Sequence, residues 1–154
     1  MRVLGVDPGK VRVGLAVTDA DGLIATPLRV VERRGACEEI QQTAADLEVE
    51  TIVVGLPLNM DGTEGPSAED ARALGERLSA AGLQVEYLDE RLTTVGAERV
   101  LIESGHSRRR RREITDAVAA TIVLEAYLAR QRNARLRDRR RAGSAADPDA
   151  GEET

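Results

Sequence analysis

The sequence predicts an α/β domain built on a five-stranded mixed sheet with helices on both faces. From residue 1 to 31, three short apolar runs are separated by turn residues, which is typical of antiparallel strands. From residue 36 to 131, segments with helical periodicity alternate with apolar runs, which indicates strand–helix–strand units. The 154 residues, 42% of them hydrophobic, suffice for one domain with a substantial core.

The first two runs predict a β-hairpin. Residues 2–6 are apolar or β-branched apart from Arg2 and Gly5, and residues 11–18 alternate between apolar side chains and small or polar ones. Asp7 stands between them, where the first strand ends. Two interpretations of Asp7 are open: it forms the turn together with Pro8 and Gly9, or its carboxylate is held rigidly at the edge of a cleft.

The remaining elements follow from periodicity and from turn residues. A continuous apolar run over 51–55 predicts a buried central strand, and Pro27 places the third strand at a sheet edge, because proline cannot donate to a ladder. Ser67, followed by Asp70, gives a capping-box-like helix start. The predicted elements after the hairpin are a strand over 23–31, a helix over 37–48, a strand over 51–55, a loop over 56–66, a helix over 67–81, a strand over 84–88, a short helix from Thr93 or Thr94 to Gly105, and a helix over 114–131.

The order of these elements limits the topology. Right-handed crossovers favour a sheet whose first strand is central and flanked by the second and fourth, with the third and fifth at the edges. Cys37 lies on the apolar face of a predicted helix, which favours a small buried hydrophobe over a nucleophile.

Charge divides the chain into three parts. Residues 1–107 carry 10 basic and 19 acidic side chains, residues 108–141 carry 12 arginines and four acids, and residues 142–154 carry four acids and no base. The sequence therefore predicts a folded domain over 1–131 and a disordered tail over 132–154, Arg-rich and then acidic, because the tail lacks the apolar residues of a core.

Three acids lie at the ends of predicted strands or at the start of a predicted helix. Asp7 ends the first strand, Glu90 follows the fifth, and Asp116 opens the last predicted helix. Strands one and five end on the same side of the predicted sheet, and carboxylates gathered there would repel one another unless they held a divalent metal. Each acid also has an ordinary interpretation: a turn for Asp7, a surface ion pair for Glu90, and compensation of the helix dipole for Asp116.

Four segments resemble the YqgF/RuvX family of pre-16S rRNA nucleases, which are related to Holliday-junction resolvases. The resemblance covers residues 1 to about 131 and excludes the tail. It implies a ribonuclease-H-like fold, a role in 5′-end maturation of ribosomal RNA, and Asp7, Glu90 and Asp116 as catalytic acids that bind Mg²⁺ or Mn²⁺. The four segments are VDPGKVRVGLA (6–16), VGLPLNMDGT (54–63), DERLTT (89–94) and DAVAA (116–120).

Several polar residues are candidates for binding nucleic acid. Lys10 lies beside Asp7, and Asn59 belongs to the long loop after the fourth strand. The run Arg108, Arg109, Arg110, Arg111 and Arg112 is the strongest candidate for phosphate binding, because five like charges repel unless something neutralises them. With no Phe or Trp and only two Tyr, the chain favours contacts to backbone and shape over base stacking. His106 matches no catalytic position.

These observations favour a metal-dependent nuclease acting on RNA, with pre-16S rRNA as the expected substrate. The alternatives are a resolvase acting on branched DNA and an RNA-binding factor without catalysis. An actin-like ATP-binding protein also opens with a strand pair around an acidic turn, but 154 residues are too few for its two lobes. One cysteine, no signal peptide and no apolar run of transmembrane length favour a cytoplasmic protein without a membrane partner.

Overall fold

The computed structural model describes the backbone of residues 1–92 and 108–146, and the side chains of residues 1–91 and 116–143. The short helix expected between Thr93 and Gly105 and the predictions for His106 lie outside the described residues. Within the described part, no helix is both long enough and apolar enough to cross a membrane.

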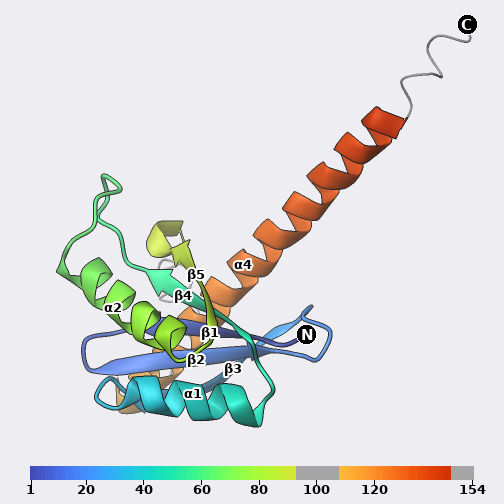
Figure 1. Ribbon diagram of the computed structural model, residues 1–154. Helices are drawn as coiled ribbons and strands as arrows, with labels where there is room; N and C mark the ends of the chain where they lie inside the picture. The colour runs from blue at the N-terminus through green and yellow to red at the C-terminus, as the bar shows by residue number, and fades with distance from the viewer. Residues whose placement is uncertain (93–107, 147–154) are drawn as a thin grey trace, which may run out of the picture.

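The five predicted strands form one sheet in the order β3-β2-β1-β4-β5 (Figure 1). β1 pairs antiparallel with β2 and parallel with β4, and β5 runs parallel to β4. This order confirms the predicted topology, including the edge position of the strand that contains Pro27, where the register with β2 shifts. The strands are β1 (Val3–Pro8), β2 (Arg12–Thr18), β3 (Ala25–Glu32), β4 (Thr51–Leu56) and β5 (Gln84–Asp89).

Helices cover both faces of the sheet, as predicted. Alternation along the strands divides the core in two: Ile52 and Val54 of β4 pack under α1 (Ala36–Asp46) and α2 (Pro66–Ala80), whereas Val53 packs under α4 (Arg108–Ala146). Because both faces are covered, β4 is buried along its whole length. Cys37 is buried in the first of these layers, in agreement with its predicted structural role.

α2 begins at Pro66, after Gly65 at its N-cap, and no side-chain hydrogen bond caps it. The capping-box interpretation of Ser67 and Asp70 was therefore wrong, and proline at the first helical position defines the start instead. Asp70 forms an ion pair with Arg33, with Nη2 and Oδ1 3.0 Å apart, which ties α2 to the segment after β3.

The last helix is longer than predicted at both ends. α4 runs from Arg108 to Ala146, not from residue 114 to 131, so residues 132–146 are helical and the prediction of disorder was wrong for them. These residues lack core-forming side chains, as expected, but they are mostly Arg, Ala and Leu, with no proline and no glycine before Gly143. Such residues readily extend a helix that is already nucleated by a buried segment.

Candidate active site

Asp7 lies near the end of β1, where the hairpin turns into β2. The turn is closed by the Gly9 amide, which donates to the Arg12 carbonyl over 2.9 Å, and Asp7 faces Gly14 of β2 in the strand register. The strand thus holds the partly exposed carboxylate at the sheet's end, the second of the two interpretations left open, while the turn itself is built by Pro8, Gly9 and the Arg12 carbonyl.

Glu90 follows β5 directly and begins the short 3₁₀ helix η1 (Glu90–Leu92). Its side chain is only 9% exposed and lies over Gly55 of β4, where a Cβ would stand 2.1 Å from Glu90 Oε1. A carboxyl group buried against a glycine in this way is not a surface ion-pair partner. The ordinary interpretation of Glu90 therefore does not hold.

The carboxyl groups of Asp7 and Glu90 lie within hydrogen-bonding reach of each other. Burial, followed by the hydrogen bond and the negative charge of Asp7, raises the pKa of Glu90 to about 10. Burial and the Asp7 carboxylate therefore both favour the protonated form of Glu90. The parallel arrangement of β1, β4 and β5 produces this contact, since it gathers the carboxyl ends of these strands at one edge of the sheet.

Asp116 lies two turns inside α4, not at its N-terminus. The favourable effect of a helix dipole on an acid is confined to the first turn, so the dipole interpretation of Asp116 fails. α4 packs directly on β2 here: a Cβ on Gly14 would stand 1.9 Å from the Asp116 carbonyl oxygen. The Asp116 carboxylate is 3.9 Å from Arg12 Nε, and both side chains are about 30% exposed.

The structure thus brings Asp7 and Glu90 into contact and sets the backbone of Asp116 against Gly14, the strand partner of Asp7. Over residues 1–91 and 116–143, however, no three acidic, histidine or cysteine side chains are gathered closely enough to hold a metal ion together. The chemistry of the Asp7–Glu90 pair nonetheless fits a divalent cation, because carboxylate oxygens are the donors that Mg²⁺ and Mn²⁺ prefer.

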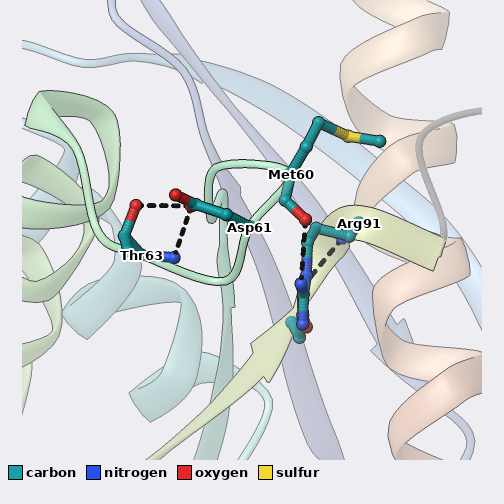
Figure 2. A network of polar contacts seen from close by, with 5 residues as sticks. Met60, Asp61, Thr63 and Arg91 are labelled. Carbon is teal, nitrogen blue, oxygen red and sulfur yellow. Dashed lines mark hydrogen bonds and ion pairs between the residues drawn. The ribbon is translucent and has the colours of Figure 1, made fainter.

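A loop after β4 lies beside Arg91, the residue that follows Glu90 in the chain (Figure 2). Asp61 accepts hydrogen bonds from the amide and hydroxyl of Thr63, at 3.0 and 2.6 Å, and these bonds lower the pKa of Asp61. Arg91 donates to the Met60 carbonyl over 3.4 Å and forms an ion pair with Asp89. Arg91 therefore connects the loop to Asp89, the residue that precedes Glu90 in the chain.

The residues predicted to bind nucleic acid lie in three different parts of the fold. Lys10 is exposed at the hairpin turn beside Asp7. Asn59 is exposed in the loop and donates to the Thr63 hydroxyl over 3.0 Å. The run Arg108 to Arg112 forms the first turn of α4, and its side chains lie outside the described residues.

Four residues that shape this site were not predicted from the sequence. Arg12 is the ion-pair partner of Asp116, Arg91 anchors the loop, and Gly14 and Gly55 allow Asp116 and Glu90 to approach the sheet. The two glycines gave a signal, because glycine inside a strand often marks a close approach by another segment.

The sheet order and the acids at its carboxyl edge define the ribonuclease-H-like class, and solved resolvases share this fold. Thermus thermophilus RuvC in complex with a Holliday junction aligns with a TM-score of 0.53 and 19% identity, covering 85% of this chain and 96% of that chain. The fowlpox virus resolvase, solved with Holliday junction DNA, aligns with a TM-score of 0.52 and 10% identity, covering 85% and 99%.

Sequence relatives narrow the class to a family. Residues 1–130 match the family model described as "RuvX: Holliday junction resolvase", so the chain belongs to the RuvX family. A "Putative pre-16S rRNA nuclease" of Anaeromyxobacter dehalogenans is 50% identical over 135 residues, which are 85% of this chain and 98% of the relative. A Clostridium botulinum protein of the same name is 44% identical over 134 residues, 84% of this chain and 98% of the relative. These matches confirm the resemblance seen in the four segments.

Proposed function

We propose that the chain is a metal-dependent nuclease that hydrolyses phosphodiester bonds in pre-16S rRNA, acting in the cytoplasm. The observation that carries this proposal is the buried contact between Asp7 and Glu90 at the carboxyl edge of a ribonuclease-H-like sheet. The substrate is taken from relatives of 44–50% identity that are named for this activity.

Asp7, Glu90 and Asp116 are proposed as the catalytic acids and as ligands to Mg²⁺ or Mn²⁺; in the described structure only Asp7 and Glu90 are in contact, so Asp116 would have to move toward them to complete the metal site. When bound, such a cation supplies charge stabilisation to the phosphoryl oxygens and to the attacking water. The protein's own contribution is positional: strands β1 and β5 fix two carboxyl groups, and the packing of α4 on Gly14 fixes the backbone of Asp116 against β2. Burial of Glu90 keeps bulk water from its carboxyl group.

Lys10, Asn59 and the run Arg108 to Arg112 are proposed to contact the phosphate backbone. They lie at the hairpin turn after Asp7, in the loop that Arg91 contacts and at the start of the helix that carries Asp116. Removing the charges of the arginine run should weaken binding to all RNAs about equally, because phosphate contacts carry little sequence information.

The decisive experiment compares pre-16S rRNA with a four-way DNA junction, each with Mg²⁺, with Mn²⁺ and with EDTA. Cleavage of the rRNA that requires metal and is lost in Asp7→Asn, Glu90→Gln and Asp116→Asn is the expected result. Because the three acids act as one unit, a double variant should be little worse than a single one. Cleavage by Asp116→Asn at the full rate would remove Asp116 from the site.

A second candidate is cleavage of branched DNA, which is favoured by the fold shared with RuvC bound to a Holliday junction. Preferential cleavage of the junction would establish it. Binding of either nucleic acid without cleavage under all metal conditions would instead favour an RNA-binding factor that has no catalytic activity.

A further inference from the structure

The C-terminal part of α4 stands away from the domain. Figure 1 shows the helix leaving the sheet and continuing alone toward the C-terminus. Tyr127 and Leu128 are the last buried side chains, and beyond Arg132 most side chains are exposed, including Leu136 at 51%. We call residues 130–146 the arginine arm.

The arm has a high positive charge that the described residues do not neutralise. It contains seven arginines and one acid, Asp138. None of these arginines forms an ion pair with residues 1–91 or 116–143, whereas five basic side chains of the domain do. Arginines four residues apart, such as Arg135 and Arg139, repel each other on a helix. The arm therefore has charge available for an anionic partner.

Three of these arginines share one face of the helix. Arg132, Arg135 and Arg139 follow the spacing i, i+3, i+7 and line a shallow groove with Leu136. The face extends about 10 Å along the helix axis, given a rise of about 1.5 Å per residue. Successive phosphates of a duplex strand are about 3.4 Å apart along its axis, so the face matches about three phosphates.

The arm also lies outside what the family shares. The family match ends at residue 130, and relatives that are matched over 98% of their own length align with only 84–85% of this chain. The fold and the candidate acids are thus accounted for without the arm, so any role of the arm is additional to theirs.

We propose that the arginine arm binds the sugar–phosphate backbone of a structured nucleic acid at a distance from the catalytic acids. The idea rests on the proposed function for the identity of the substrate. Arg132 and Arg139 lie about 24 and 35 Å along α4 from Asp116, at about 1.5 Å per residue. That length corresponds to about 7 to 10 base pairs of duplex. The arm would therefore bind the flank of a long substrate and leave short substrates to the domain alone.

The test replaces Arg132, Arg135 and Arg139 together, either with Gln or, as the matched control, with Lys. Binding to a 20-base-pair RNA duplex is measured in EDTA across a salt series. The Gln variant should raise Kd at 0.1 M salt by at least about tenfold and flatten the slope of log K against log salt by about 2 to 3. The Lys variant should retain the wild-type slope, because it keeps the three charges.

A Gln variant with the wild-type salt slope would overturn the proposal, as would arm-dependent binding to anionic phosphatidylserine vesicles that exceeds binding to RNA. Unchanged melting temperature and domain fold in both variants are expected, since the arm is exposed. Binding in EDTA needs no cleavage, so arm-dependent binding by a protein that cleaves nothing would sustain this inference while the proposed function fails.

If the wild type cleaves, substrate length supplies a second measurement. The Gln variant should raise KM for substrates whose duplex flank exceeds about 10 base pairs, the reach estimated above, and leave kcat unchanged. Substrates with shorter flanks should be processed as by the wild type. A KM effect that is the same for all lengths would contradict the placement of the arm on the flank.

Discussion

A Cβ on Gly55 would stand 2.1 Å from Oε1 of Glu90, so the glycine in β4 is what leaves room for the buried carboxyl group. Gly55→Ala should displace Glu90 and break its contact with Asp7. We expect cleavage to fall by at least about a hundredfold, as for other misplacements of about 1 Å, and stability by about 1–3 kcal/mol. Gly143→Ala is the matched control, because no described atom lies within 4 Å of a Cβ there. Full activity in Gly55→Ala would show that Glu90 is not held by this packing.

The sheet and the pairing of Asp7 with Glu90 could be predicted because each depends on local signals. The hairpin turn after Asp7, the edge proline Pro27 and the unbroken apolar run of β4 fix the strand order. Parallel strands then place the ends of β1 and β5 at one edge. The position of Asp116 within its helix was misjudged, because the helix start was set by apolar periodicity at Ile114 and not by the helix-forming arginines before it.

Other features depend on packing between segments that are distant in the chain, and a single sequence does not reveal which segments meet. Gly14 and Gly55 were visible as glycines inside strands, but nothing local indicates that Asp116 and Glu90 lie over them. The helical state of residues 132–146 was missed for a related reason. A composition that cannot build a core excludes burial, but it does not exclude a helix that grows out of a buried one.

Glu90 should make stability depend on pH. Its pKa is about 10 in the folded chain against an ordinary 4.5, so the stabilisation is fully present below about 4.5 and is lost as pH rises toward 10. The slope cannot exceed about 1.4 kcal/mol per pH unit for one proton. Glu90→Gln should remove this slope and leave the protein at least as stable at pH 8. Urea unfolding in EDTA from pH 5 to 9 measures it, with exposed Glu39→Gln as control. If the free energy of unfolding changed with pH in the same way for the wild type and for Glu90→Gln, the raised pKa of Glu90 would be refuted.

Tyr127 fixes α4 to the sheet just before the arginine arm begins. Its hydroxyl donates to Glu86 Oε2 over 2.6 Å, and burial together with this carboxylate raises the pKa of Tyr127 to about 12. Tyr127→Phe should cost about 1.5–3 kcal/mol, the range for a hydrogen bond to a charged group. Tyr87→Phe is the control and should cost less, because its hydroxyl reaches the Arg72 carbonyl only at 3.5 Å. Equal losses in chemical unfolding would contradict the ranking.

Divalent metal should release a proton when it binds. Glu90 keeps its proton at neutral pH in the metal-free protein, and a cation coordinated by Asp7 and Glu90 requires both groups to be ionised. Calorimetric titration with Mg²⁺ or Mn²⁺ at pH 7, in buffers of different ionisation enthalpy, should report release of about one proton. Glu90→Gln has no such proton to lose, so any residual binding should show no dependence on the buffer. Asp7→Asn should lose most metal binding, while Glu39→Gln should behave as the wild type. Wild-type binding without proton release would mean that the cation does not displace the proton between Asp7 and Glu90, and the pair would then not be the metal site.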